Sequence, residues 1–354
     1  MGKLAVYKLI YLISIITTLL IVAITITAAF CAQINPNENI LIAMLGLGLP
    51  VLLIINLVLM IYWMLRRRFW LWFPLIAILA NIGYLTSIIQ YSADVKAEGK
   101  TIKVATFNIH SFNNEITGYT AKEIARFMEK EKVDILCFQE LVPNLDFNID
   151  SIYATYKNFP YAYSPSDNEK YRISILSKYP IVQSKFVPFA LSSNCGLWVD
   201  IDINGKIIRV FNVHMQTTSL NQSRALLAKQ HVRGDAELEK EALDKMTESL
   251  ESNFKMRAQQ ADKIHAMIDT TKYPVILCGD FNDTPASYTY KKLRGNLKDG
   301  FRTNGNGYGY TFRGLYGLLR IDYILYSPQL KGVDYYSTPI DWSDHNPVIM
   351  ELAI

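Results

Sequence analysis

Residues 275–283, VILCGDFND, are the stretch around which this chain is organised. Four apolar residues run directly into Gly-Asp-Phe-Asn, and Pro274 precedes them, so the run predicts a short buried strand. Because side chains alternate between the two faces of a strand, Asp280 and Asn282 should lie on the same side at its end. Buried strands of α/β folds carry functional polar side chains at such ends, although a simple Asp-x-Asn turn is the alternative interpretation. We therefore expect an α/β fold with a functional site at this strand end.

The charge distribution divides the chain of 354 residues, half of which are hydrophobic, into two unequal parts. Five of the 36 basic residues and one of the 32 acidic residues precede Ser92, which leaves 31 of each sign after it. The larger part is therefore about neutral, which argues against a strongly basic nucleic-acid-binding surface but leaves a local basic patch open. The four cysteines show no CxxC or Cys/His metal spacing, so no disulfide framework is expected.

Three apolar segments precede Ser92, at about residues 6–32, 40–65 and 69–91. Each has at least roughly the 20 apolar residues that cross a bilayer, so we expect three transmembrane helices. A buried core helix is the alternative for any one of them. The expected organisation is a transmembrane region at 1–91, a polar linker at 92–101 and a catalytic domain at 102–354.

Positive charges predict how these segments are oriented. Lys3 and Lys8 precede the first segment, and the arginines at 66–68 join the second to the third, whereas residues 35–38 contain no Lys or Arg. The positive-inside rule therefore places the N-terminus and the arginines in the cytoplasm. Three spans then place everything after residue 91 on the opposite side, which in a bacterium is the periplasm or the cell exterior. We expect a multi-pass protein of the bacterial inner membrane.

Predicted strands and helices alternate from residue 102 onward. Asn204-Gly205 is a strong two-residue hairpin signal between two of the strands. Residues 223–270 are charged with one apolar face, which predicts a helix packed on the sheet, with a membrane-skimming or partner-binding arm as the alternative. The other expected elements are strands at 102–107, 133–139, 172–177, 197–203 and 207–214 and a helix at 121–130.

Polar residues flank the strand-like runs in six motifs. Each motif alone is usually a turn or a surface residue, whereas six of them at strand edges form a pattern. The motifs are TFN at 106–108, QE at 139–140, NVH at 212–214, GDFND at 279–283, RIDYIL at 320–325 and SDHNPV at 343–348. Their order resembles the endonuclease/exonuclease/phosphatase superfamily of DNase I-like proteins, over about residues 102–354. The resemblance implies a four-layer α/β sandwich, with two packed mixed sheets and helices outside, and a metal-dependent phosphoesterase activity.

The resemblance also implies a role for each motif residue. Phosphodiester hydrolysis needs a divalent cation on the phosphate oxygens, an activated water and donors for the developing charge, and carboxylate and amide oxygens suit Mg²⁺ or Mn²⁺. The implied metal-site residues are Glu140 as the main ligand, Asn108 as its helper and Asp344 on the metal or leaving-group side. The implied catalytic residues are Asp280 as base, Asn282 holding water or phosphate, His345 on the phosphate with Asp322 orienting it, and His214 as a donor.

Some positions depart from parts of the family or add to its pattern. His110 stands where abasic-site endonucleases carry an acid, which puts a second carboxylate at the metal in doubt. Residues 320–323 do not match the signature of the inositol-polyphosphate branch, which disfavours that branch. Arg172 and Arg313 are candidates for binding the substrate phosphate, with surface arginines as the alternative. The glycine-rich residues 304–310 predict a flexible loop beside the site.

The sequence thus predicts a membrane-anchored, Mg²⁺- or Mn²⁺-dependent phosphoesterase that hydrolyses phosphodiester or phosphomonoester bonds. The neutral charge and the membrane tether favour a lipid or another small phosphodiester as substrate. A DNase I-like endonuclease or exonuclease acting on nucleic acid is the first alternative. A catalytically inactive membrane binding module is the second, and the complete set of acids, amides and histidines argues against it.

Overall fold

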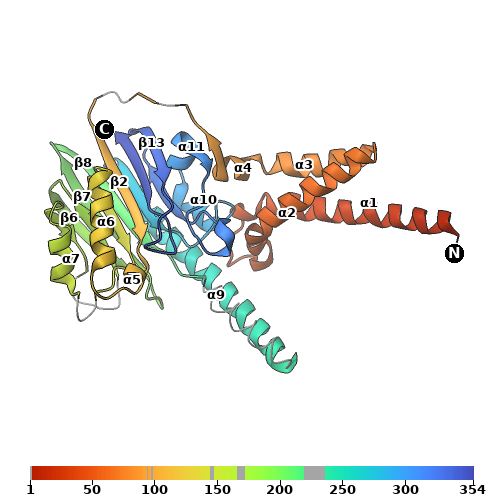
Figure 1. Ribbon diagram of the computed structural model, residues 1–354, viewed down its shortest axis with the longest axis horizontal. Coiled ribbons are helices and arrows are strands. Elements are labelled where there is room, and N and C mark those ends of the chain that lie inside the picture. Colours follow the sequence, from red (N-terminus) through yellow and green to blue (C-terminus); the bar gives the residue numbers. More distant parts are fainter. Residues whose placement is uncertain (1, 94, 97–98, 144–146, 166–171, 219–235) are drawn as a thin grey trace.

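The computed structural model describes residues 2–354 except 94, 97–98, 144–146, 166–171 and 219–235. Within these residues the apolar runs build two six-stranded sheets, which confirms the predicted α/β class (Figure 1). The first sheet, in the order β10-β12-β9-β8-β7-β6, contains β6 (Ile181–Pro188), β7 (Cys195–Ile203), β8 (Lys206–His214), β9 (Val275–Asp280), β10 (Lys298–Asp299) and β12 (Asp322–Tyr326). The second, in the order β13-β14-β2-β3-β5-β4, contains β2 (Thr101–Asn108), β3 (Ile135–Gln139), β4 (Tyr161–Tyr163), β5 (Ile173–Ser177), β13 (Lys331–Ser337) and β14 (Val348–Ala353).

Both sheets are mixed. The β2–β3 and β8–β9 pairs run parallel, and the other neighbours within the two sheets run antiparallel. Ile203 pairs with Lys206, so Asn204 and Gly205 form the predicted hairpin turn with φ angles of 57° and 88°. A turn with two positive φ angles matches the twist of the flanking strands.

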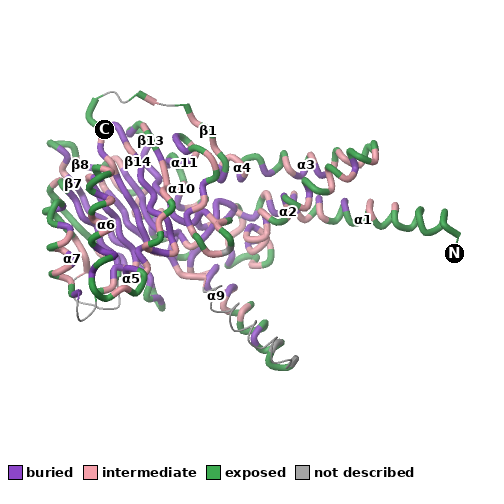
Figure 2. Tube along the Cα trace, in the orientation of Figure 1, coloured by how far each residue is buried: buried purple, intermediate pink, exposed green. Residues whose placement is uncertain are grey.

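The core lies between the sheets, and helices cover their outer faces (Figure 2). One apolar cluster joins alternate side chains of both sheets, such as Val104 and Val210. A second cluster packs α6 and α7 on the outer face of the β2 sheet, and a third packs α9 and α10 on the outer face of the β9 sheet. The helices are α5 (His110–Asn113), α6 (Tyr119–Lys130), α7 (Ile149–Thr155), α9 (Ala236–Asp269), α10 (Tyr288–Arg294), α11 (Gly300–Asn304) and the 3-10 turn η3 (Leu315–Gly317).

Helix α9 accounts for most of the charged region predicted at 223–270. Its Ala258, Ala261 and Ile264 are fully buried, so this part of the helix packs on the two-sheet unit as expected. Residues 223–235 of the prediction lie outside the described residues.

The pairing of strands brings the ends of β8, β9 and β12 together. Asp280 at the end of β9 is paired with Asp322 on one side and with His214 on the other. Gly279 makes the close approach possible, because its φ is 141° and a Cβ there would lie 1.9 Å from the Val213 carbonyl oxygen. A residue with a side chain could not occupy this position without moving β8.

The N-terminal region contains two long apolar helices instead of the three that the sequence predicts. Helices α1 (Lys3–Ala28) and α2 (Ile40–Leu65) are long and apolar enough to cross a membrane. The third predicted span is broken: after η2 (Phe69–Leu71), α3 (Trp72–Ala80) and α4 (Ile82–Ile88) meet at Asn81 with a bend of 58°. At the bend the Asn81 side-chain amide donates to the Ala77 carbonyl oxygen of the same segment at 2.9 Å and to the Thr25 carbonyl oxygen of α1 at 3.1 Å. Such side-chain bonds to the backbone compete with helix continuation.

The predicted span at 69–91 also ends too late, because residues 89–91 form a strand. Here β1 (Ile89–Tyr91) pairs with β11 (Asn306–Tyr308), so the glycine-rich segment predicted as a flexible loop is partly a strand on the N-terminal region. Two further contacts join the same parts. The Cys31 thiol in η1 (Cys31–Gln33) donates to the Ala286 carbonyl oxygen at 2.8 Å, and Arg320 donates to the Ser87 carbonyl oxygen at 3.0 Å.

The apolar helices therefore have one end on the two-sheet unit and one end away from it (Figure 1). At the distant end the Arg66 guanidinium donates to the Tyr7 hydroxyl at 3.0 Å, and the Trp70 indole donates to that of Tyr11 at 3.1 Å. Helices α1 and α2 run antiparallel between these two ends, and α3 with α4 leads the chain back to the sheets.

A buried ion pair stabilises this junction, and its loss should destabilise the fold. Asp299 accepts two hydrogen bonds from the Arg320 guanidinium and one from the Tyr290 hydroxyl, and both charged side chains are buried. Replacement Asp299→Ala leaves a buried arginine without its counter-charge, so we expect the free energy of unfolding to fall by about 3–5 kcal/mol. Denaturant titration of the protein in detergent measures the change.

The control is Glu241→Gln, which breaks the exposed Glu241–Lys245 pair on α9 and should hardly alter stability. Equal stability of the Asp299→Ala variant and the wild type would show that the Arg320–Asp299 pair does not hold the junction.

Candidate active site

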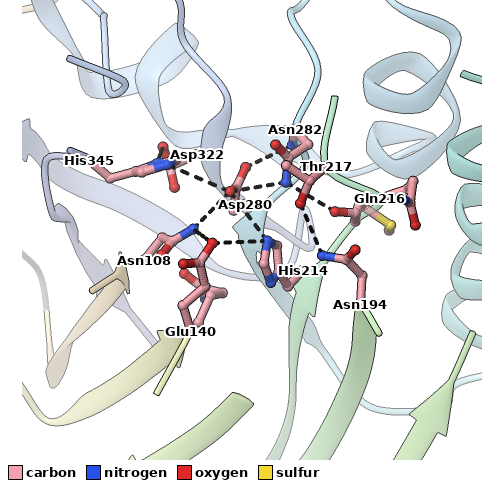
Figure 3. Close-up of polar contacts among 12 residues, drawn as sticks. Asn108, Glu140, Asn194, His214, Gln216, Thr217, Asp280, Asn282, Asp322 and His345 are labelled. Atoms are coloured by element: carbon pink, nitrogen blue, oxygen red, sulfur yellow. Dashed lines mark hydrogen bonds and ion pairs between the residues drawn. The ribbon is translucent and has the colours of Figure 1, made fainter. Parts of the chain in front are cut away.

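The structure gathers most of the motif residues at neighbouring strand ends (Figure 3). Asn108 ends β2, Glu140 follows β3, and His214 and Asp280 end β8 and β9. A cavity of about 420 Å³ opens beside them, and its lining includes Glu140 and Asp280. Asn282, Asp344 and His345 also line this cavity.

Asp322 and His345 form a buried acid–imidazole pair. His345 Nδ1 lies 2.9 Å from Asp322 Oδ2, and its Nε2 lies 3.9 Å from Asp280 Oδ2. Burial works against a charged imidazole, but Asp322 and Asp280 outweigh it and raise the pKa of His345 to about 10. The site therefore presents an imidazolium N–H near the Asp280 carboxylate at neutral pH.

Asp280 is held by amides on both of its oxygens. The Asn282 backbone N–H donates to Oδ1 at 2.8 Å, and the side-chain amides of Asn282 and Asn108 donate to Oδ2 at 3.2 and 3.1 Å. Asn282 reaches this position because its φ of 51° turns the chain back at the end of β9. Burial and the neighbouring Asp322 charge raise the pKa of Asp280 to about 7, so this carboxyl group can exchange a proton near neutral pH.

Glu140 is more accessible in the cavity than Asp280, with 31% of its side chain exposed against 1%. Its Oε1 accepts from the Asn108 amide at 3.1 Å and lies 3.7 Å from His214 Nε2. Burial tends to raise the pKa of Glu140, but His214 and Asn108 outweigh it, and the pKa falls below its ordinary value. Burial lowers the pKa of His214, whose Nε2 has no hydrogen-bond partner among the described residues.

The donor set fits a hard divalent cation in one of two places. The predicted ligands Glu140, Asn108 and Asp344 supply oxygens at the accessible side, although Asn108 turns its NH₂ group toward Glu140 and would have to rotate to offer its oxygen. Among the described residues, a second group of ligand atoms, from Asp280, Asp322 and His345, lies within 4.8 Å of one another. The family resemblance implies catalytic roles for that group, and a hydrogen bond of 2.9 Å already joins Asp322 and His345. We favour the Glu140 side for this reason.

The two predicted phosphate-binding arginines and His110 lie around the cavity or beside it. His110 lines it, with Nδ1 3.3 Å from Asp344 Oδ1. Arg172 lines a neighbouring cavity that also includes Glu140. Arg313 lines neither of these two cavities, because its guanidinium contacts the Ile340 and Ser343 carbonyl oxygens and Asp341. Its proposed phosphate contact stays a prediction, and its observed contacts support the loop that carries Asp344.

Polar residues beneath the site hold the two sheets in register. The Gln139 amide donates to Asn212 Oδ1 at 2.5 Å, and the Asn212 amide donates to the Phe138 and Ser174 carbonyl oxygens at 2.9 and 2.8 Å. Both side chains are fully buried. The motifs QE and NVH contain Gln139 and Asn212, but the sequence analysis gave roles only to Glu140 and His214 of these motifs.

Arg257 of α9 is the main cavity residue that the sequence analysis missed. It is 1% exposed, it lines the cavity, and it donates to Asp283, to the Gln216 carbonyl oxygen and to Thr218 Oγ1 at 3.2, 2.8 and 2.9 Å. The sequence does contain a signal for Arg257, because this charged residue lies on the apolar face of the helix predicted at 223–270. Leu47 of α2 also lines the cavity, and no sequence pattern connects it with residues more than 90 positions later.

Comparison with known proteins identifies a family for most of the chain. Residues 105–345 match the family model described as the Endonuclease/Exonuclease/phosphatase family. Residues 7–88 match a family described as a domain of unknown function. A search of curated proteins found no significant match.

Solved structures share the fold at low sequence identity. An endonuclease/exonuclease/phosphatase from Bacteroides vulgatus is 20% identical with a TM-score of 0.51, over 72% of this chain and 99% of that one. D. rerio TDP2 complexed with a single-strand DNA product is 14% identical with a TM-score of 0.52, over 72% of this chain and all of that one. Truncated Caenorhabditis elegans TDP2 is 17% identical with a TM-score of 0.51, over 72% and 98%. At these identities the likeness shows the fold alone.

Metal binding by the purified protein should distinguish the two cation positions. Replacement Glu140→Gln removes the carboxylate of the proposed main ligand. Loss of a residue that only supports a metal ligand lowers metal affinity roughly 10–100-fold, so we expect Mn²⁺ affinity to fall by at least this much. Titration followed by Mn²⁺ electron paramagnetic resonance measures it. Glu351→Gln, a partly exposed position on β14, is the matched control. Unchanged affinity in Glu140→Gln, together with a loss in Asp322→Asn, would place the cation in the Asp280–Asp322–His345 group.

Proposed function

The chain belongs to the endonuclease/exonuclease/phosphatase family, and from this premise we propose that it is a divalent-metal-dependent phosphoesterase anchored in a membrane. The observation that supports the proposal best is one cavity lined by Asp280, Glu140 and His345, in which the pKa of Asp280 is about 7 and His345 is hydrogen-bonded to Asp322. A base, an imidazolium donor and an accessible carboxylate are the groups that hydrolysis of a phosphate ester needs.

In the proposed reaction Asp280 accepts the proton of the attacking water. The amides of Asn282 and Asn108 hold this carboxylate in place. The water oxygen bonds to phosphorus while the bond between phosphorus and the ester oxygen breaks, and the ester oxygen takes a proton from solvent water and leaves as an alcohol. The His345 imidazolium, kept charged by Asp322, donates to a phosphate oxygen, and His214 can donate through its unpartnered Nε2.

A divalent cation completes the proposed site. Glu140, with Asn108 and Asp344, would hold Mg²⁺ or Mn²⁺, which neutralises charge on the phosphate oxygens when bound. The lowered pKa of Glu140 suits this role, because the carboxylate stays ionised when the cation is absent.

The proposed organisation keeps residues 1–91 as the membrane region, 92–101 as the linker and 102–354 as the catalytic part. In this proposal the broken segment of α3 and α4 crosses the membrane as the third span. The basic residues at 66–68 lie at the distant end of the helices, so the catalytic part would face the periplasm or the exterior of a bacterium.

Two substrate classes fit the proposal. A lipid or another small phosphodiester is favoured by the neutral charge after Ser92 and by direct contact between the apolar helices and the two-sheet unit. Nucleic acid is the alternative, because D. rerio TDP2 of the same fold is complexed with single-strand DNA product. A catalytically inactive binding module is the second alternative. Such a module would not need an aspartate whose pKa is raised to about 7, so the surroundings of Asp280 argue against it.

The first test of the proposal is metal-dependent turnover. The full-length protein should hydrolyse bis(4-nitrophenyl) phosphate with Mg²⁺ or Mn²⁺ and lose this activity in EDTA. Replacement Asp280→Asn keeps the shape but removes the base, so turnover should fall on the order of 10²–10⁴-fold. Asp150→Asn, an exposed aspartate outside the cavity, should leave turnover unchanged. Equal rates for Asp280→Asn and wild type would remove Asp280 from the reaction.

Topology has a separate test. A reporter enzyme fused after Ile354 should behave as exported, because three crossings from a cytoplasmic N-terminus end outside. The same reporter inserted after Asn37, between α1 and α2, should also be exported, and one inserted after Arg67 should stay inside. A cytoplasmic signal after Ile354 with an exported signal after Asn37 would show that α3 and α4 do not cross.

Salt dependence distinguishes the two substrate classes. A protein that neutralises several phosphates of DNA loses roughly 10³-fold or more in affinity between about 50 and 200 mM salt. Since the part after Ser92 is balanced in charge, we expect weak DNA cleavage and a shallow salt dependence for a lipid phosphodiester. Efficient nicking of plasmid DNA that collapses over this salt range would instead favour the nuclease alternative.

A further inference from the structure

Two cavities of similar size meet at the candidate active site. The first, of about 420 Å³, and the second, of about 410 Å³, share Glu140 and Thr217 in their linings. Asp280 and His345 line the first cavity, and His214 lines the second. A phosphodiester bound at Glu140 would have room for one ester substituent in each cavity.

The two cavities differ in chemical character. Beyond the catalytic residues, the first cavity has an apolar wall formed by Leu47, Phe254, Phe312, Leu319 and Ile321. The second is lined beyond Glu140 and His214 largely by polar side chains, including Arg172, Ser193 and Asn194. A substrate that fills both would carry one apolar and one polar substituent on the same phosphate.

The apolar wall includes a residue of a candidate membrane helix. Counting back from Leu65 at the distant end of α2, 20 residues reach Gly46, and this is roughly the number that spans the hydrocarbon core of a bilayer. With α2 inserted to this depth, Leu47 would lie at the edge of the bilayer that faces the two-sheet unit. The neighbouring Gly46 packs closely against the two-sheet unit, because a Cβ at this residue would lie 2.6 Å from the Ala286 carbonyl oxygen. The same carbonyl oxygen accepts a hydrogen bond from the Cys31 thiol at 2.8 Å.

We propose that the substrate is an amphipathic phosphodiester lipid that reaches the site from the bilayer along α2. Its hydrocarbon-bearing part lies against the wall of Leu47 and Phe254, its phosphate lies at Glu140 and Asp280, and its polar head group lies toward Arg172. A guanidinium favours a head group with hydroxyl or anionic oxygens over a quaternary ammonium. This inference rests on the proposed phosphoesterase activity and on insertion of α2 into the membrane.

The experiment compares two substrates of the full-length protein in lipid nanodiscs. One is phosphatidylglycerol in the disc, and the other is soluble bis(4-nitrophenyl) phosphate. Replacement Leu47→Ala removes part of the apolar wall, so we expect the ratio of kcat/KM for the lipid to that for the soluble ester to fall about tenfold, since lost apolar contact in a pocket costs roughly this much. Leu47→Met, which conserves volume, should restore most of the ratio.

Two matched variants complete the design. Leu57→Ala changes an exposed leucine of the same helix, which lies outside both cavities, and should leave the ratio unchanged. Arg172→Gln should lower turnover of phosphatidylglycerol more than that of phosphatidylcholine, because it removes the guanidinium from the proposed head-group cavity.

The outcomes separate this inference from the proposed function. Hydrolysis of the soluble ester without turnover of either lipid, or an equal loss on both substrates in Leu47→Ala, would overturn the lipid assignment and leave the phosphoesterase intact. Preferential cleavage of a single-stranded oligonucleotide would overturn it in favour of nucleic acid. Failure of the wild type on every substrate with Mg²⁺ and Mn²⁺ would contradict the proposed function itself, and the lipid assignment with it.

Discussion

Two buried carboxylates, Asp280 and Asp322, face each other across the β9–β12 ladder, and the structure must balance their like charges. His345 provides the balance, with Nδ1 2.9 Å from Asp322 and Nε2 3.9 Å from Asp280. The same arrangement separates their chemistry, because the pKa of Asp280 rises to about 7 while His345 stays protonated. Several features of the site position this trio. Gly279 allows β9 to approach β8, Asn282 and Asn108 donate to Asp280, and Ser343 donates to the Asn108 carbonyl oxygen at 2.7 Å.

The apolar helices and the site form one structure. Strand β1 pairs with β11. Cys31 donates to the carbonyl oxygen of Ala286, which lies only four residues after Asn282. Arg320, two residues before Asp322, donates to both the Ser87 carbonyl oxygen and Asp299. Leu47 of α2 enters the wall of the same cavity as Asp280. A membrane anchor on a free tether would make none of these contacts. The position of the site at the junction is therefore set by buried, directional interactions and not by linker length.

Sequence patterns predicted the α/β class, the Asn204-Gly205 hairpin and two of the apolar helices because each is encoded locally. Alternation, turn residues and runs of apolar residues act over a few positions. The break at Asn81 was missed because its cause is the Thr25 carbonyl oxygen on another helix, together with the local bond to Ala77. The glycine-rich segment was read as a loop because its partner strand, β1, is more than 200 positions away. Hydropathy alone does not reveal either partner.

The sequence by itself determined which residues are candidates for chemistry, because strand-end motifs keep acids, amides and histidines next to apolar runs. It also determined which family the chain resembles. Only the tertiary structure decided how these residues share protons, since the pKa of Asp280 depends on its burial and on Asp322 across a strand pair. It also decided that Arg257 and Leu47 line the cavity, because α9 and α2 reach the site through packing and not through any local pattern. Contacts between residues far apart in the chain depend on the whole fold, and a local motif does not contain them.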